Sequence, residues 1–277
     1  LFSLESGLRG DYVLEYGAAI LPRLSLLYKA TDKLSSRLIG GIGYKTPSVF
    51  SEESERIQYR NVAAVTPDSN KLEKSYGGNW DVNYRTLLFD NKITFSVNQL
   101  FFYTYLDNPL MLGSPAPGQY RFKNIDGHID AQGSETNIKI GLGHFKLFLG
   151  YTYTHTHVHT AASIQETTLT PAHHTNSVLM FEIEGKWKLG LEGYYYSSQK
   201  LSDGTTDRDY WLCGFMAEKI WKRFSLFVNF ENFLDNRQSR FGSIYTGSIT
   251  SPVFRDIYAP LDGFVVNGGL KLNLSAK

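Results

Sequence analysis

Apolar and polar side chains alternate one by one over much of the chain. In 145–154 the odd positions carry Phe, Leu, Leu, Tyr and Tyr, whereas the even positions are mostly polar or small. The same period of two recurs from Ile93, Trp187, Phe224 and Phe264. Successive side chains of a β-strand point to opposite faces of a sheet, so each segment predicts a strand with one apolar face. No segment shows the spacing of an amphipathic helix, and we expect an all-β protein.

The alternating segments predict about twelve strands, each near or above the roughly 9–11 residues that a tilted strand needs to cross a bilayer. Each segment is bounded by turn-forming residues, which sets its ends. The expected strands span 2–15, 20–30, 34–44, 72–86, 92–104, 129–142, 145–159, 172–184, 187–199, 209–220, 223–234 and 262–274.

The connections between these strands are short and long in turn. Short connections lie at 31–33, 89–92, 143–144, 184–186 and 221–223, and long ones at 45–71, 107–118, 161–170 and 236–260. Antiparallel barrels of the outer membrane have short periplasmic turns and longer extracellular loops. A soluble β-sandwich gives no reason for this asymmetry. The sequence therefore predicts a transmembrane antiparallel β-barrel.

Composition sharpens this prediction. Aromatic residues make up 14% of the chain, and the formal net charge is +1. The near-neutral charge argues against a nucleic-acid partner. The single cysteine, Cys213, excludes a disulfide framework within the chain. Outer-membrane barrels carry aromatic girdles at both interfaces, whereas in a sandwich the same aromatic residues would fill a core. The girdle candidates are Tyr151, Tyr153, Trp187, Tyr195, Trp221 and Phe224.

Six motifs, taken in order, resemble the C-terminal barrel half of a TonB-dependent outer-membrane receptor of the Bacteroides type. They lie at 22–28, 41–48, 73–76, in a hairpin formed by 102–104, 107–109, Asn124 and 131–135, and at 169–173 and 231–235. The last reads Glu-Asn-Phe-Leu-Asp, and the segment at 169 reads Leu-Thr-Pro-Ala-His. The physical role that we assign to Gly133, Asn232 and Asp235 is architectural: the glycine allows the sheet to bend, and the polar side chains end the strand ladder.

This resemblance implies a fold and a set of partners. The family has barrels of about 22 strands with a plugged lumen, so this chain is expected to hold about twelve of them, with the plug domain absent from this chain. The implied location is the outer membrane of a Gram-negative bacterium. The implied partners are outer-membrane lipid and lipopolysaccharide, the plug domain and remaining barrel strands, TonB through the plug, and a surface lipoprotein.

Polar residues in phase with one another form the expected lumen face. In a receptor these side chains would contact the plug, and their mixed charges predict little ion selectivity. The candidates are Asn79, Asp81, Asn83, Arg85, Glu135, Lys139, Glu192, Asn229, Glu231 and Lys271. The long loop at 45–71 adds Glu52, Glu53, Arg56 and Arg60 as candidates to cap a ligand, although a solvated charge run is the favoured alternative.

A histidine cluster suggests a metal site. His155, His157 and His159 share one strand face, and His173 and His174 follow the next loop. If the hairpin is symmetric, His155 lies near His173 or His174, and the pair His155 and His174 can bind Zn²⁺, Cu²⁺ or haem iron. The phase places the first three histidines on the outward face, so an exposed hairpin tip is the favoured alternative. We expect no cofactor.

The resemblance implies energy-coupled import of a scarce nutrient: a ferric chelate, haem, a cobalamin or an oligosaccharide. Two alternatives stay open at this point. One is a passive porin of about twelve strands, and the other is a structural surface barrel. We expect no enzymatic activity, because no nucleophile, base and orienting group occur together at a defined spacing.

Overall fold

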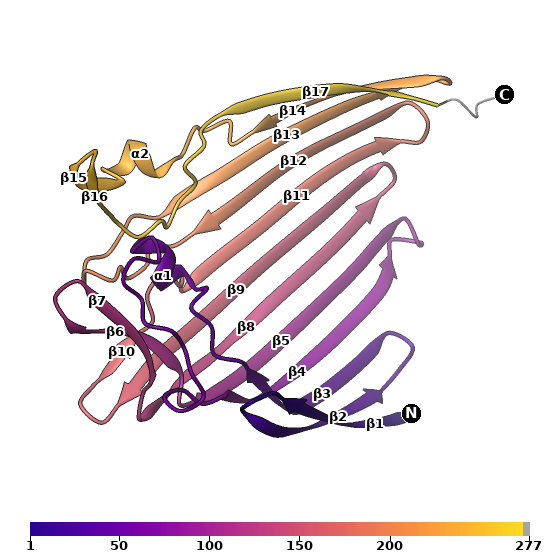
Figure 1. Ribbon diagram of the computed structural model, residues 1–277. Helices are drawn as coiled ribbons and strands as arrows, with labels where there is room; N and C mark the ends of the chain where they lie inside the picture. Colours follow the sequence, from indigo (N-terminus) through magenta and orange to yellow (C-terminus); the bar gives the residue numbers. More distant parts are fainter. Residues whose placement is uncertain (274–277) are drawn as a thin grey trace.

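One antiparallel sheet extends through the whole chain (Figure 1). The computed structural model describes residues 1–273, except the side chains of Glu52 and Arg56. The strands of this sheet are β1 (Phe2–Val13), β2 (Gly17–Lys29), β3 (Leu34–Lys45), β4 (Glu73–Leu88), β5 (Ile93–Asp107), β8 (Gly127–Leu142), β9 (Phe145–Thr160), β10 (Ile164–Glu166), β11 (His173–Ile183), β12 (Trp187–Tyr196), β13 (Tyr210–Ile220), β14 (Phe224–Glu231) and β17 (Val265–Leu272).

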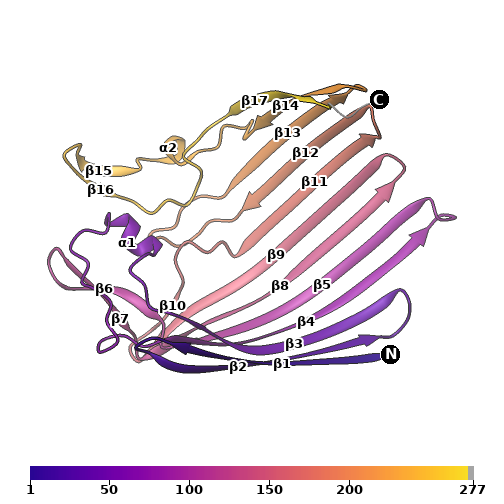
Figure 2. The same ribbon diagram turned by 45° about the vertical axis from the view of Figure 1, so that its right-hand side comes forward.

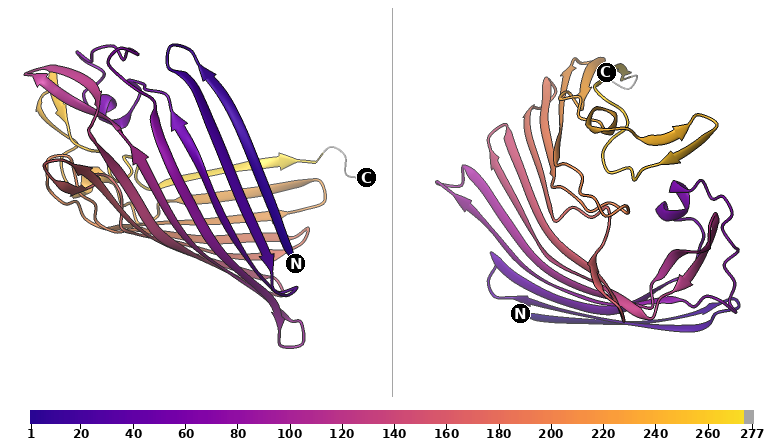
Figure 3. Two further views of the ribbon diagram at one scale, coloured as in Figure 1. Left: turned by 90° about the horizontal axis from the view of Figure 1, so that it is seen from below. Right: turned by 90° about the vertical axis from the view of Figure 1, so that its left-hand side faces the viewer.

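The strand order follows the chain from β1 to β17, and β10 adds to β9 beside this path. Consecutive strands in this order pair antiparallel. The sheet curves into an open half-barrel with β1 and β17 as its two edges, as an end-on view shows (Figure 3). The all-β fold and the twelve-stranded antiparallel sheet predicted from the sequence are confirmed, and the barrel is not closed by this chain.

The register gives the two faces of the sheet opposite chemistry. On the convex face, the side chains of Leu4, Leu8, Leu38 and Leu270 are each more than half exposed. Among the described residues, the buried hydrophobic side chains are only three, Phe122, Tyr210 and Ala259. A sandwich would bury its apolar face against a second sheet, whereas this apolar face stays open, as a lipid-facing surface does.

The two ends of the sheet differ as the sequence predicts. The tight turns between β2 and β3, β4 and β5, and β8 and β9 lie at one end, together with the start of β1 and the end of β17 (Figures 1 and 2). The long connections lie at the other end, which we call the loop rim. One connection differs from the expected alternation: 14–16, between β1 and β2, is at the loop rim but is short.

The twelve strands on the main path overlap the twelve predicted ranges, with ends that differ by a few residues. The long loops contain elements that the alternation did not predict. These are α1 (Glu52–Arg56), α2 (Gln238–Phe241), the hairpin of β6 (Leu110–Ala116) and β7 (Gln119–Asn124), the hairpin of β15 (Tyr245–Ser248) and β16 (Ser251–Phe254), and β10. In the described part of the chain, neither helix is long and apolar enough to span a membrane.

Candidate functional site: the concave face and the loop rim

The concave face carries a continuous polar network on β3, β4 and β5. Asp81 is 5% exposed. It pairs with the guanidinium of Arg37 at 3.1 Å and accepts a hydrogen bond from the side-chain amide of Asn83. Asn98 on β5 extends the chain by donating to Asn83 at 2.9 Å. A carboxylate in this position is stable because charged and amide donors satisfy both of its oxygens.

The remaining expected lumen residues lie on the same face, because their registers place them in phase. Most of them contact a polar side chain on their own strand or on a neighbouring strand. Asn137 donates to Glu135, Tyr194 donates to Glu192 at 2.9 Å, Asn267 donates to Glu231 at 2.6 Å, Asn229 donates to Asn267 at 2.9 Å, and Lys271 pairs with Glu218 at 3.1 Å. Asn79 is half-buried on this face.

Two hollows lie along the concave face. The one near the loop rim, of about 580 Å³, is lined by Glu192, Glu231 and Asp262 together with the loop residue Pro260. The one near the turns, of about 610 Å³, is lined by Lys33, Arg85 and Lys139 together with Asp32 and polar neighbours. The hollow near the loop rim is therefore acidic, whereas the hollow near the turns carries three basic residues and one acidic residue.

The loop rim contains two folded units. The first, which we call the N-terminal loop body, consists of 46–72 and the β6–β7 hairpin. Asn70 is 2% exposed, and its amide donates to the carbonyl of Phe122 at 2.9 Å. Asn124 accepts from the backbone N–H of Lys71 at 2.8 Å. These bonds join segments about 50 residues apart, so this loop has a fixed conformation.

The second unit, the C-terminal loop body, consists of 197–209 and 232–264. The carboxylate of Asp256 accepts from the backbone and the hydroxyl of Ser202. Gln238, which is 2% exposed, donates to the carbonyl of Asp256 at 2.7 Å and accepts from the backbone of Tyr258. Tyr210 at the start of β13 donates to the carbonyl of Tyr258 at 2.8 Å. The two long loops on this side therefore pack as one body.

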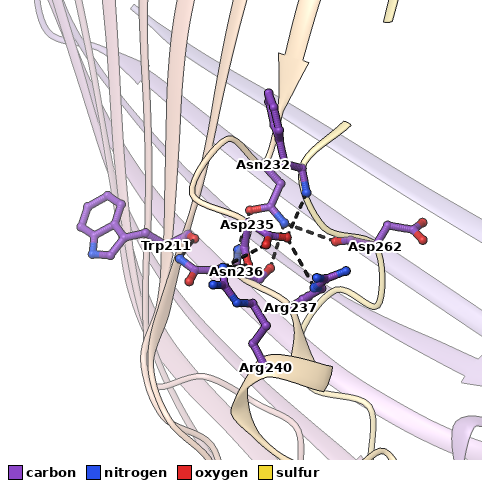
Figure 4. Close-up of polar contacts among 8 residues, drawn as sticks. Trp211, Asn232, Asp235, Asn236, Arg237, Arg240 and Asp262 are labelled. Atoms are coloured by element: carbon purple, nitrogen blue, oxygen red, sulfur yellow. Dashed lines mark hydrogen bonds and ion pairs between the residues drawn. The ribbon is translucent and has the colours of Figure 1, made fainter. Parts of the chain in front are cut away.

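A cluster of side chains at the end of β14 holds this body to the sheet (Figure 4). We call it the loop clamp: Asn232, Asp235, Asn236, Arg237 and Arg240. Asn232 and Asp235 both adopt positive φ, 45° and 52°, where the chain leaves the strand. Asn232 donates to the carbonyls of Asn236 and Asp262, and Asn236 donates to the carbonyl of Trp211 on β13. The architectural role expected for Asn232 and Asp235 is what these bonds provide.

Asp235 forms the centre of the loop clamp. Its Oδ1 accepts from the backbone N–H of Phe264 at 3.2 Å and lies 3.4 Å from Nε of Arg237. Its Oδ2 pairs with Arg240 at 2.9 Å. One carboxylate thus connects the end of β14, the start of α2 and the entry to β17.

Residues 2–233 match the family model described as "TonB dependent receptor-like, beta-barrel". The chain belongs to this receptor family. Comparison with curated proteins gives no match. Members of the family are transporters rather than enzymes, and they reside in the outer membrane of Gram-negative bacteria.

Solved structures with the same fold include three receptors. A mutant of the ferric enterobactin receptor of Pseudomonas aeruginosa has a TM-score of 0.69 at 18% identity, covering 97% of this chain and 42% of its own. The FrpB iron transporter of Neisseria meningitidis has a TM-score of 0.66 at 11% sequence identity, and the match covers 97% of this chain and 42% of the transporter. The siderophore receptor PirA of Acinetobacter baumannii has a TM-score of 0.69 at 16% sequence identity, and the match covers 98% of this chain and 43% of PirA. This receptor chain thus spans less than half the length of these neighbours.

The expected ligand loop has a partly structural role in this receptor chain. Glu53 accepts from the backbone N–H of Leu112 at 3.3 Å and so connects α1 to β6. Arg60 is exposed. Glu52 and Arg56 bound α1, and their side chains lie outside the described part of the structure.

The girdle candidates lie at the two ends of the strands, on the outward face or in a turn. Tyr151 and Tyr153 are on the loop-rim half of β9, and Trp187, Trp221 and Phe224 are beside the turns. Each of these five side chains is between 37% and 41% exposed. Tyr195 is half-buried against Trp211, with ring centroids 5.2 Å apart, and its hydroxyl donates to Asp209.

The structure corrects the expected histidine pair. β9 and β11 pair with Tyr153 opposite His173 and Thr152 opposite His174. His155 therefore shares the convex face with His173, whereas His174 points to the concave face, and the two expected ligands lie on opposite sides of the sheet. The hairpin is not symmetric about 161–170, because β10 folds back on β9 inside this connection.

Several residues of the site were not predicted from the sequence. Arg37 and Glu218, the partners of Asp81 and Lys271, lie in phase with the polar face of their strands, and this phase is the signal that could have found them. Gln238 carried no such signal, because its role depends on the carbonyl of Asp256, 18 residues away in an irregular segment.

One loop carboxyl group gives a pH-dependent prediction. Burial raises the pKa of Asp207, the hydrogen bond from the backbone of Gln199 opposes this rise, and Asp209 adds to it. The Oδ2 atom of Asp207 is buried without a hydrogen-bond partner. Because the folded loop favours the protonated acid, its stability contribution is fully present below the unfolded pKa of about 3.9 and decreases as the pH rises through the raised folded pKa.

We therefore expect Asp207→Asn to stabilise the loop 197–209 against opening at about pH 7. The gain in the free energy of loop opening should be up to about 1 kcal/mol for this half-exposed group, and the substitution should change this free energy little at about pH 3. Hydrogen exchange of these loop amides at the two pH values measures this. Asp203→Asn is the matched control, because the hydroxyl of Thr205 lowers the pKa of Asp203 and the substitution should not protect the loop. Equal effects of both substitutions would contradict the assignment.

Proposed function

We propose that this chain forms the part of an outer-membrane receptor that captures a scarce nutrient at the loop rim and passes it along the concave face in TonB-dependent import. The observation that carries this proposal is the hydrogen-bonded polar concave face beneath two folded loop bodies. A passive pore needs only a wet lumen. The fixed loop bodies instead provide a preformed surface for a ligand.

The polar lumen residues support a plug partner. The acidic hollow with Glu192 and Glu231 and the basic hollow with Arg85 and Lys139 lie at opposite ends of the concave face. A plug that presents basic groups toward the loop rim and acidic groups toward the turns would complement them. We propose that the plug docks in this orientation and that TonB acts on it.

Among the candidate nutrients, a ferric chelate that is anionic and aromatic fits the C-terminal loop body best. A hollow of about 300 Å³ there is lined by Arg208, Arg255, Phe241 and Tyr258, together with the acidic residues Asp207 and Asp256. The guanidinium of Arg208 lies 4.8 Å from the ring centroid of Phe241, and the charge of Arg255 acts on the nearby carboxylate of Asp203. Guanidinium groups beside aromatic rings favour ligands that carry both negative charge and aromatic rings. The iron chelates named for the structural neighbours make this class the first to test.

Arg208→Ala and Arg255→Ala should each weaken binding of a ferric tricatecholate about 10-fold, the effect of one charge-assisted contact. Tryptophan fluorescence titration of the purified receptor measures this, with haem, cobalamin and an oligosaccharide as competing ligands. Arg60→Ala in the N-terminal loop body is the matched control and should bind normally. Weakened binding in this control alone would move the ligand site to the N-terminal loop body.

Energy coupling is tested separately from binding. Cells that produce the receptor should accumulate radioactive iron chelate, and deletion of TonB or collapse of the proton gradient should abolish accumulation. A passive porin would accumulate the chelate equally in both backgrounds. Uptake without TonB would therefore overturn the proposed mechanism while leaving the binding result intact.

A further inference from the structure

The structure brings together three potential metal ligands that were not the pair expected from the sequence. His128 and Asp130 lie two residues apart on β8, and His159 lies directly opposite His128 on β9. Their ligand atoms are all within 4.8 Å of one another. We propose that His128, Asp130 and His159 bind one divalent transition-metal ion, of the zinc, copper or nickel kind, on the convex face at the loop rim.

The backbone geometry brings the three ligand residues to one place on the sheet. β8 and β9 pair over their full lengths, from Gly127 opposite Thr160 to Leu142 opposite Phe145. Directly opposed residues and their neighbours at i+2 share one face of a regular ladder, so the ladder brings the three ligand residues together. Because each zinc bond is about 2.1 Å long, ligand atoms of one ion lie within about 4 Å of each other. To reach this spacing, the stacked rings of His128 and His159, now 11° from parallel, have to turn so that a nitrogen of each ring points at the same ion.

The three side chains and a neighbouring ring contact one another. The imidazole rings of His128 and His159 stack with centroids 4.2 Å apart and an interplanar angle of 11°. Nε2 of His159 lies 2.5 Å from Oδ1 of Asp130. Tyr105 of β5 stacks on the other side of His128 at 4.5 Å. The side chains of His159 and Asp130 are 28% and 15% exposed, so the site is partly shielded and still open to solvent.

The ligand types select the class of metal. Imidazole nitrogen suits zinc, copper and nickel, whereas calcium and magnesium prefer sites built from oxygen ligands. Two imidazoles and one carboxylate leave a coordination position for water or for an outside ligand. An ion here would connect β8 to β9 where the strands end. It would lie on the face opposite the polar network, so this proposal is independent of the import pathway.

The test is a titration of Zn²⁺ into the purified receptor after removal of metals with a chelator. We expect binding to fall by at least about 100-fold in His128→Ala and in His159→Ala, since loss of a ligand exceeds the 10–100-fold effect of its outer partners. His144→Ala, in the turn at the other end of β8 and β9, and His174→Ala, on the concave face, should bind normally.

Spectroscopy keeps the test decisive if a variant misfolds. Co²⁺ added to the unaltered receptor should give visible absorption bands typical of nitrogen coordination, and Zn²⁺ should displace them. Asp130→Asn should shift these bands without removing the two histidines. Absence of Co²⁺ bands, or unchanged zinc affinity in both folded histidine variants, would overturn the proposal. Loss of zinc binding in His174→Ala alone would place the ion on the concave face instead.

Discussion

Gly133→Ala is expected to prevent normal pairing of β8 with β9 and to destabilise the folded barrel by about 3 kcal/mol or more, at the upper end of overpacking effects. A Cβ atom at this position would collide with the carbonyl oxygen of Tyr153 and would lie 2.6 Å from Cζ of Phe102. The ring of Phe102 can rotate, but the carbonyl belongs to the backbone of the neighbouring strand. The glycine is therefore required by the close approach of two strands.

Urea unfolding of the receptor in detergent micelles measures this loss, with heat-modifiable migration as a second readout. Gly190→Ala is the matched control, since this glycine lies on the same face in β12 and a Cβ would meet nothing within 4 Å. The double variant Gly133→Ala with Phe102→Ala should stay defective, because only the ring clash is removed. Full recovery in the double variant would show that the ring and not the carbonyl sets the constraint.

Asp235→Ala is expected to release the C-terminal loop body from the sheet. The substitution removes the acceptor for the Phe264 N–H and leaves Arg237 and Arg240 without their carboxylate. Loss of one charged acceptor with several donors costs about 1–3 kcal/mol. Because the contacts are local to the loop clamp, the effect should appear as loop opening while the strand ladder persists.

Limited proteolysis measures this release, and we expect cleavage within 236–264 to accelerate about 10-fold or more, the ratio for about 1.4 kcal/mol. Asp235→Asn should accelerate cleavage less than Asp235→Ala does, since an amide oxygen still accepts a hydrogen bond from the backbone N–H of Phe264. Asp262→Ala is the control, because only its backbone carbonyl takes part in the loop clamp, and its carboxylate points away in Figure 4. Faster cleavage in Asp262→Ala than in Asp235→Ala would contradict the central role of Asp235.

The strands and their faces could be predicted from the sequence. The alternation in β9 places Leu147 and Leu149 on one face and Gly150 and Thr152 on the other, as the register with β8 and β11 also does. This works because the period of two is a property of the strand backbone itself. The polar set from Asp81 to Lys271 was found in the same way.

The histidine site shows where this reasoning ends. The convex face of His159 followed from its phase, but its partners did not, because they depend on which residue of the next strand lies opposite. His128 precedes His159 by about 30 residues in the chain and is brought to it by the β8–β9 register. The pair expected from the sequence, His155 with His174, required a symmetric hairpin, and the folded-back β10 removed that symmetry. A shift of one residue changes the face of every side chain.

By itself, the sequence determined an all-β membrane barrel with one lipid-facing and one polar face, and with long loops gathered mainly at one end. These features depend on local alternation and on turn residues, which act over a few positions. Only the tertiary structure decided that the loops form two bodies, that Asp235 closes one of them, and that His128 meets His159. These features depend on single hydrogen bonds and on strand registers between distant segments. One example is the hydrogen bond from Asn70 to Phe122, which lie 52 residues apart. No local sequence pattern encodes such a pairing.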